Sequence, residues 1–358
     1  MALNNLCITL SQSLISKNVA FCLYRFPGED HFRIAIDEAF LPHEKEKTFW
    51  VAPFCQFSAA HDIYLAVLNQ SFLTEDFLKE IDAVAEQAPF ADLPLPIEKS
   101  KQDYYDRIHA FLKDIRSGKL EKAILSRVFY ENKPEDFDVP GCFLRLAESY
   151  PQTFVHLLVH PESGVWLGAT PELLMRKRNE EIATMALAGT QKRKQMSEYE
   201  WRIKEREEHL MVGGHIEKIF SEYNCTLQKA EGPHYCEAGG VVHLQTDYLF
   251  KANPNLDLRS FLMVLHPTPA VGGLPADKGI ECILEHEGYD RRYYCGFLGE
   301  TDFKTSADLY INLRNMQVGK DKIVIFVGGG ITSASDPDEE WLETVMKSKT
   351  MVEKIFEA

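Results

Sequence analysis

Short runs rich in aromatic and β-branched residues alternate with turn-forming residues near the start of the chain. This pattern is typical of strands, and the clearest runs cover residues 19–24, 32–36, 49–53 and 63–67. Residues 88–97 then contain three prolines, which exclude a regular helix and indicate a connector. The sequence therefore predicts a strand-rich N-terminal portion over residues 1–95 and a larger portion over residues 96–358.

Apolar residues at helical spacing follow the connector at three places. They predict helices over residues 104–115, 201–223 and 333–356. The second contains Gly213 and Gly214, each of which costs about 1 kcal/mol in a helix relative to alanine, so we expect close packing there. The third begins near Ser335, Asp336 and Pro337, residue types that cap a helix or suit its first turn.

The composition describes a globular protein that binds neither nucleic acid nor an anionic membrane. The 358 residues are 45% hydrophobic and carry a formal charge of −15, which repels polyanions at long range. No signal peptide or membrane span is visible, and the eight cysteines form no Cys-x-x-Cys pair. We expect a cytoplasmic protein with reduced cysteines. An anionic small molecule would need a pocket that is locally basic or holds a metal.

Two glutamate pairs are suited to a hard cation. Glu205 and Glu208 in one predicted helix are three residues apart, so they share a helix face. Glu340 and Glu343 have the same spacing in another helix. Oxygen ligands without a histidine cluster favour Mg²⁺. For any one such pair, the alternative and commoner interpretation is solvated helix surface.

Three further charged residues and a glycine run complete the candidate chemistry. Lys122 opens an apolar strand, where burial would favour a neutral amine that acts as a base; the alternative is a surface lysine. Glu172 could stay protonated if buried, or cap the next helix. Lys347 points to the same face as Glu343, where it could also form an ion pair within the helix. The glycines at 328–330 let backbone N–H groups approach an anion, or form only a strand-to-helix turn.

Taken in order, these segments resemble the chorismate-utilising enzymes. The resemblance covers roughly residues 100–356 and rests on the motifs Lys122-Ala-Ile-Leu-Ser-Arg127, Gly168-Ala-Thr-Pro-Glu172-Leu-Leu174, Ala186-Leu-Ala-Gly-Thr190, Lys204-Glu-Arg-Glu-Glu-His209, His266-Pro-Thr-Pro-Ala-Val-Gly-Gly273, Arg291-Arg-Tyr-Tyr-Cys-Gly296, Leu313-Arg314, Gly328-Gly-Gly-Ile331 and the block from Asp336 to Lys347. So many ordered motifs are hard to obtain by chance. The resemblance implies an α+β fold, one large unit with antiparallel sheets packed between helical layers.

Within this family, two places are similar to the isochorismate synthases. The segment from His266 to Gly273 is like theirs, and Lys122 is present, whereas the ammonia-adding anthranilate synthases lack this base. Both features imply water as the nucleophile. Ala270 stands where salicylate synthases have threonine, which argues against a second, pyruvate-releasing activity. The implied reaction converts chorismate to isochorismate, for menaquinone or for siderophore biosynthesis.

The resemblance also implies a role for each site residue. Lys122 would take a proton from the water that attacks C2 of chorismate, and Glu172 would protonate the leaving C4 hydroxyl. The Mg²⁺ site would consist of the ligands Glu208 and Glu343, with Glu205 and Glu340 nearby. The residues expected to contact the substrate are Gly189, Thr190, His266, Ala270, Tyr294, Arg314, Gly328, Gly330 and Lys347.

Two alternatives remain open. A salicylate synthase would add a pyruvate-lyase step to the same reaction. A non-catalytic chorismate-binding or amidotransferase-partner subunit would keep the fold, although Lys122, Glu172 and the paired glutamates argue against lost catalysis. No obligatory glutamine amidotransferase subunit is expected.

Overall fold

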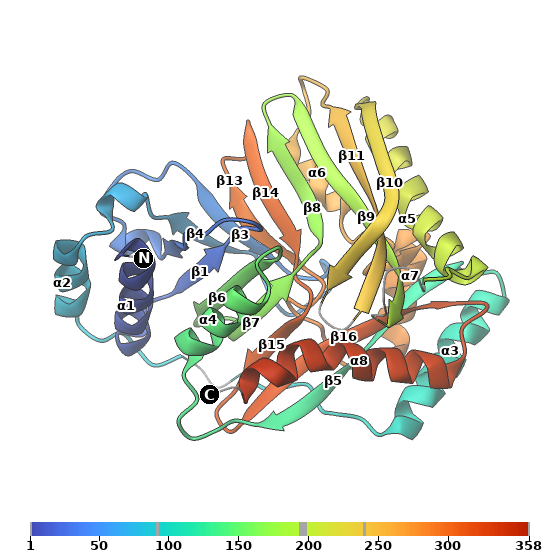
Figure 1. The fold of residues 1–358 in the computed structure, drawn as a ribbon, viewed down its shortest axis with the longest axis horizontal. Coiled ribbons are helices and arrows are strands. Elements are labelled where there is room, and N and C mark those ends of the chain that lie inside the picture. The colour runs from blue at the N-terminus through green and yellow to red at the C-terminus, as the bar shows by residue number, and fades with distance from the viewer. Residues whose placement is uncertain (1, 91–92, 193–198, 239–240, 357–358) are drawn as a thin grey trace.

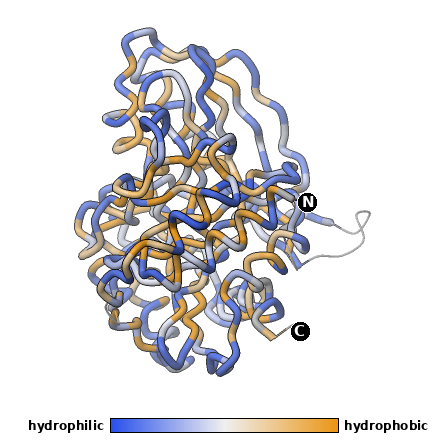
Figure 2. The backbone as a smooth tube through the Cα atoms, turned by 90° about the vertical axis from the view of Figure 1, so that its left-hand side faces the viewer, coloured by the Kyte–Doolittle hydropathy of each residue, from blue (hydrophilic) through white to orange (hydrophobic). Residues whose placement is uncertain are grey.

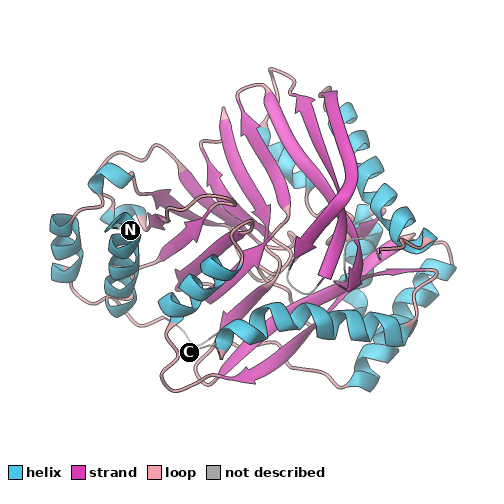
Figure 3. Cartoon of the chain, viewed as in Figure 1, coloured by secondary structure: helices cyan, strands magenta, loops and turns pink. Residues whose placement is uncertain are grey.

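One antiparallel sheet organises the molecule (Figure 1). The computed structural model describes residues 2–90, 93–192, 199–238 and 241–356. Within these residues, sixteen strands are hydrogen-bonded into a single sheet, and every pair in it is antiparallel. Helices surround the strands (Figure 3). The α+β class predicted from the sequence is confirmed, with one continuous sheet in place of several.

The elements run as follows. The strands are β1 (Phe21–Arg25), β2 (Arg33–Ile36), β3 (Thr48–Ala52), β4 (Ile63–Val67), β5 (Lys122–Asn132), β6 (Phe154–His160), β7 (Gly164–Thr170), β8 (Leu173–Arg178), β9 (Glu181–Lys192), β10 (Thr226–Ala238), β11 (Val241–Lys251), β12 (Gly273–Leu274), β13 (Phe297–Thr301), β14 (Ser306–Ile311), β15 (Asn315–Val318) and β16 (Lys322–Thr332). The α-helices are α1 (Ala2–Ser16), α2 (Glu75–Ala83), α3 (Lys101–Arg116), α4 (Val139–Ser149), α5 (Ile203–Glu222), α6 (Leu258–Leu265), α7 (Ala276–His286) and α8 (Pro337–Ile355).

The four strands predicted before residue 70 are present as β1 to β4, and they lie in the middle of the sheet. The strand order is β10-β11-β9-β8-β14-β13-β3-β4-β2-β1-β6-β7-β15-β16-β5-β12. N-terminal strands are therefore inserted between strands from the second half of the chain on one side and from its middle on the other (Figure 1). The division at residue 95 stays a prediction, and hydrogen bonding of the sheet runs across it.

In the N-terminal strands β1 and β2 both faces are buried, because their apolar residues alternate between two hydrophobic cores. In β1, Cys22 and Tyr24 pack into a core that also contains residues of α3, α5, α6 and α7. Phe21 and Leu23 pack into the other core, with residues of α1, α2 and α4. Figure 2 shows hydrophobic stretches running through the interior of the molecule. Burial on both sides explains why these strands read as nearly continuous apolar runs.

The three predicted helices are present as α3, α5 and α8. The Asp336 carboxylate accepts hydrogen bonds from two backbone N–H groups at the start of α8, and Pro337 is the first residue of that helix. In α5, close packing is confirmed at Gly213, where a Cβ would lie 2.5 Å from the Tyr248 hydroxyl, but not at Gly214, where it would meet nothing within 4 Å. Of the helices that the structure describes, none is both long and apolar enough to cross a membrane.

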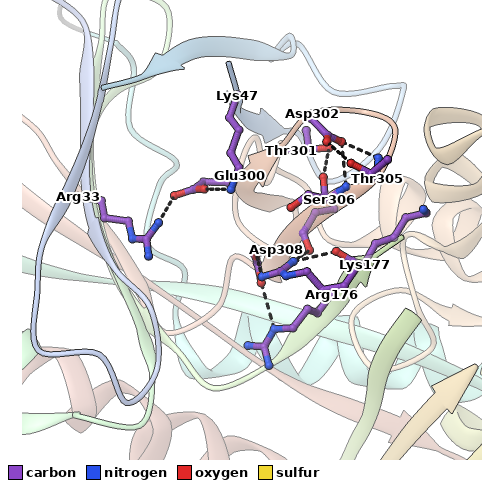
Figure 4. A network of polar contacts seen from close by, with 12 residues as sticks. Arg33, Lys47, Arg176, Lys177, Glu300, Thr301, Asp302, Thr305, Ser306 and Asp308 are labelled. Carbon is purple, nitrogen blue, oxygen red and sulfur yellow. Dashed lines mark hydrogen bonds and ion pairs between the residues drawn. The ribbon is translucent and has the colours of Figure 1, made fainter. Parts of the chain in front are cut away.

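A buried carboxylate ties the N-terminal strands to β13 (Figure 4). Glu300 accepts hydrogen bonds from Arg33 Nη1 at 3.3 Å and from Lys47 Nζ at 3.0 Å (Figure 4). The Tyr24 hydroxyl donates a third bond at 2.8 Å. Since a buried charge is tolerated only when it is paired and hydrogen-bonded, these donors make Glu300 a stable link between distant parts of the chain.

Candidate active site

A cavity holding about 710 Å³ of space, the solvent in its mouth included, lies where β5, β9, β11 and β16 meet α5 and α8. Its lining includes the predicted site residues Glu172, Gly189, Thr190, Glu208, Ala270, Tyr294, Arg314, Gly328, Gly330, Glu343 and Lys347. Four predicted residues lie outside this lining, namely Lys122, Glu205, His266 and Glu340. Glu205 and Glu340 line an adjoining cavity, which shares Glu208 and Glu343 with the first.

Lys122 begins β5 and is fully buried, which excludes the surface-lysine alternative. Its Nζ lies 2.9 Å from Oε1 of Glu208 on α5. Burial alone would raise the pKa of the Glu208 carboxyl, but the charge and close contact of Lys122 lower it, with smaller contributions from the charges of Lys347 and Lys204. Glu208 therefore stays ionised, and Lys122 reaches the cavity through its contact with this carboxylate.

Glu172 lies between β7 and β8, so the alternative that it caps a helix is wrong. Its side chain lines the cavity and is almost completely buried. Burial raises its pKa to about 8, although Lys122, Lys347 and Arg314 act in the opposite direction. Glu172 is therefore mainly protonated at neutral pH and can donate a proton to a ligand in the cavity.

A histidine that the sequence analysis missed connects two predicted substrate contacts. Arg314 Nη2 lies 3.0 Å from His243 Nε2, and Thr190 Oγ1 lies 3.1 Å from His243 Nδ1. Burial, together with the charges of Arg314 and Lys347, lowers the pKa of His243 well below its usual value, so the ring is neutral. Arg314 consequently donates to Nε2, and the Nδ1 proton faces Thr190. No motif marks His243; only its pairing opposite Thr190 between β11 and β9 would have revealed it.

The glycines at 328–330 lie inside β16, which overturns the strand-to-helix turn considered for them. They are paired with residues 124–126 of β5. Lys347 on α8 reaches this strand, because its Nζ donates to the Gly328 carbonyl oxygen at 2.9 Å. The same Nζ lies 2.6 Å from Oε1 of Glu343, so the ion pair within the helix is also present.

Each of the four predicted metal-site glutamates is paired with a different cation. Two of these pairs, those of Lys122 with Glu208 and Lys347 with Glu343, are described above. The other two join Arg202 Nη2 to Glu205 Oε1 at 2.6 Å and Lys204 Nζ to Glu340 Oε1 at 2.5 Å. Burial, followed by repulsion from Glu343, raises the pKa of Glu340 to about 7. The acidic cluster is therefore neutralised by side chains of the chain itself.

The space beside β16 suits a small cation. A Cβ on Gly330 would lie 2.4 Å from Glu208 Oε1, and a Cβ on Gly329 would lie 3.2 Å from Glu340 Oε2 and 3.5 Å from Glu343 Oε1. These three carboxylates and that of Glu205 line the adjoining cavity together with Gly330. Glu205 Oε2 is buried and has no hydrogen-bond partner among the described residues. All donors are oxygens, which fits Mg²⁺ held by one or two carboxylates and several waters.

Another group of possible metal ligands lies outside the cavity. It consists of Asp114, Cys282 and His286, whose possible ligand atoms all lie within 4.8 Å of one another. In the described part of the chain, no other three Asp, Glu, Cys or His residues lie so close together. The Asp114 carboxylate already forms an ion pair with Lys119, whose Nζ lies 3.0 Å from Oδ2. The four glutamates are more widely spaced and would need waters to complete a metal's coordination.

His266 supports the cavity wall from behind. It is buried, and its Nε2 lies 2.8 Å from the backbone oxygen of Cys295, a residue of the lining. Burial lowers the pKa of His266 to about 4, so the ring is neutral and Nε2–H donates to that oxygen. Its predicted contact with the substrate is untested, and in this geometry the imidazole holds the wall in place.

Known proteins resemble this chain in sequence and in fold. The family described as chorismate binding enzyme matches residues 31–356. The isochorismate synthase EntC of Escherichia coli K12 is 29% identical over 241 residues, which are 65% of this chain and 62% of that protein. The isochorismate synthase MenF of Bacillus subtilis is 26% identical over 296 residues, which are 80% of this chain and 61% of that protein. The chain thus spans about three fifths of the length of these relatives.

Two solved structures share the fold. The putative 2,3-dihydroxybenzoate-specific isochorismate synthase DhbC from Bacillus anthracis superposes with a TM-score of 0.76 at 21% identity, covering 97% of this chain and 99% of that chain. MenF, the menaquinone-specific isochorismate synthase of Escherichia coli, gives a TM-score of 0.76 at 21% identity, covering 97% of this chain and 91% of that chain. At this level of identity the likeness establishes the fold alone.

Proposed function

The chain belongs to the chorismate binding enzyme family, and from this membership we propose that it is an isochorismate synthase that uses Mg²⁺. One observation carries the proposal: a protonated carboxylic acid, Glu172, faces a cavity that also holds cationic side chains and converging carboxylates. That combination can deliver a proton to a leaving hydroxyl and bind a dianion. The relatives named isochorismate synthase support the same assignment.

The reaction moves a hydroxyl group without net consumption of protons. An oxygen from water forms a bond to C2 of chorismate, the ring double bonds shift, and the bond from C4 to its hydroxyl breaks. Lys122 would first release its ammonium proton to solvent and would then accept the proton that the attacking water loses, while a proton from solvent would afterwards restore Glu172. Glu172 would give its proton to the departing hydroxyl, which leaves as water. The acid of the forward reaction is the base of the reverse reaction.

Substrate binding would rely on the cations in the lining. Chorismate carries two carboxylates, whereas the whole chain has a formal charge of −15, so attraction has to be local. Arg314 and Lys347 line the cavity and offer charged N–H donors, which form stronger hydrogen bonds to carboxylates than neutral donors do. Thr190 adds a hydroxyl group, and the glycines of β16, which have no side chain, let the substrate approach the backbone closely.

Bound Mg²⁺ would supply positive charge for the ring carboxylate of chorismate. Glu208 and Glu343 would be its protein ligands, with Glu205 and Glu340 placed to hold its waters. Arg202 pairs with Glu205, and Lys204 pairs with Glu340. These two ion pairs would therefore remain beside the hydrated ion.

Product analysis tests the proposal directly. Purified protein would be incubated with chorismate and Mg²⁺, with products identified by NMR and pyruvate followed through lactate dehydrogenase. We expect isochorismate without pyruvate. Pyruvate release would favour the salicylate synthase alternative, and binding of chorismate without conversion would favour a non-catalytic subunit.

We also propose that the isochorismate feeds menaquinone biosynthesis. The support is the similarity to MenF in sequence and in fold. Expression of the chain in a bacterium that lacks its menaquinone-specific isochorismate synthase should restore menaquinone, measured by mass spectrometry. The same test would be run in a strain that also lacks its siderophore-specific isochorismate synthase. If the chain restores a catechol siderophore there but not menaquinone, the proposed menaquinone role is contradicted.

A further inference from the structure

Arg127 is a buried cation that none of the described carboxylates pairs with. It lies on β5, five residues after Lys122, and is about 5% exposed. Its guanidinium carbon lies 3.5 Å from the ring centroid of Trp341 and 3.8 Å from that of Phe129. Its Nε donates to Thr344 Oγ1 at 2.9 Å. The ring of Tyr104 lies further away, at 5.6 Å, so the guanidinium is held mainly by the two nearer rings and one hydroxyl.

Two of these partners belong to α8, the helix that carries half of the metal-site glutamates. Trp341 follows Glu340, and Thr344 follows Glu343, so the contacts of Arg127 alternate with the acids along the helix. Consecutive residues of an α-helix differ in direction by about 100°, which places these contacts on the face next to the acids. A rotation of α8 that broke them would also turn the acids away from β16.

We propose that Arg127 is a positioning residue, which fixes the rotation of α8 and thereby the placement of Glu340 and Glu343 at the Mg²⁺ site. This inference rests on the proposed function. The same strand would then supply the base, Lys122, and the residue that orients the metal ligands. Only arginine combines a flat cationic surface for two rings with a directed N–H donor, so lysine cannot replace it.

Magnesium affinity separates positioning from general stability. We would titrate the full chain with Mg²⁺ in the absence of chorismate by isothermal calorimetry. Arg127→Lys keeps the charge but loses the stacked plane and the Nε bond, and loss of a residue that orients a metal ligand typically weakens affinity about 10-fold or more. Thr344→Val removes the hydroxyl that accepts from Arg127 and donates to the Trp341 carbonyl oxygen within the same helix, and it should weaken affinity to a smaller extent.

Arg25 provides a matched control. It is equally buried, and its guanidinium donates to the backbone oxygens of Ala147 and Tyr150, away from the acids of α8. Arg25→Lys should lower the thermal midpoint of unfolding while leaving the affinity for Mg²⁺ unchanged.

Each outcome decides a different point. Wild-type protein that binds no Mg²⁺ would overturn the proposed cofactor and this inference together. Wild-type binding with equal affinities in Arg127→Lys and Arg25→Lys would overturn the role of Arg127 alone. If Arg127→Lys does not fold, Thr344→Val decides the question, and wild-type affinity in that variant would count against the proposal.

Discussion

Lys122 Nζ and Glu208 Oε1 lie 2.9 Å apart, so the proposed base and a proposed metal ligand form one ion pair. The lysine is fully buried, and removal of its partner would leave an uncompensated charge in the interior. Metal binding, proton transfer and folding stability therefore depend on the same two side chains.

Glu208→Gln should abolish Mg²⁺ binding and Mg²⁺-dependent turnover, because it removes the charge of a ligand to a hard cation. It should also destabilise the fold by about 3 kcal/mol, since Lys122 loses its counter-ion. Calorimetry and urea unfolding would measure the two effects. Glu217→Gln, an exposed substitution on the same helix, serves as the control and should change neither.

Lys122→Met should slow the addition of water by a factor of about 10² to 10⁴, the usual cost of losing a general base. Chorismate binding should change less, because Arg314 and Lys347 remain. Steady-state rates and equilibrium dialysis with chorismate would separate the two quantities. Undiminished turnover would exclude Lys122 as the base and return the ammonia-adding branch to consideration.

Glu172→Gln keeps the size and hydrogen-bonding capacity of the side chain but removes the proton that the C4 hydroxyl needs. Binding should survive while turnover collapses. The variant should also fail to convert isochorismate back to chorismate, because acid and base exchange roles in the reverse direction. Activity in either direction would contradict the assignment of Glu172.

Stability should depend on pH through Glu172. Burial raises the pKa of its carboxyl from 4.5 to about 8 in the folded protein. Between these values the folded state holds a proton that the unfolded state releases, so this group makes the protein less stable as pH rises from about 4.5 to 8. The free energy of unfolding of Glu172→Gln should fall less steeply over that range, and equal slopes would contradict the raised pKa.

Gly330→Ala should weaken Mg²⁺ binding while the fold persists. The new Cβ would lie 2.4 Å from Glu208 Oε1 and 3.0 Å from Lys122 Cε, so this ion pair has to shift away from the metal site. The loss of stability should be smaller than in Glu208→Gln, because both charges remain. Gly214→Ala is the control, because its Cβ meets nothing within 4 Å; it should stabilise α5 by about 0.5–1 kcal/mol and leave Mg²⁺ affinity unchanged.

Much of the fold could be predicted from the sequence, because local patterns determine it. The N-terminal apolar runs became strands, and Asp336 with Pro337 marks the start of α8. Five helices were not predicted, namely α1, α2, α4, α6 and α7. In the N-terminal portion, the aromatic runs beside α1 and α2 dominate the pattern. The order of strands could not be predicted, since it depends on pairings such as that of β3 with β13, far apart in the chain.

The candidate site shows the same limit. Spacing placed Glu340 and Glu343 on one face, but it could not reveal which cations neutralise them, because Lys204 comes from a different helix. His243 stayed invisible for a similar reason: it lies 53 residues from Thr190 in sequence. Burial, which sets the pKa of Glu172, likewise arises only when the strands assemble.

The insertion of β1–β4 into the middle of the sheet affects how the protein must be made. These strands are translated well before β13, with which β3 pairs, and β5 is translated well before its partner β16. Until then the early strands expose unpaired edges that favour aggregation. Completion of the sheet is therefore expected only after β16 has been synthesised, and chaperones that cover sheet edges should raise the yield.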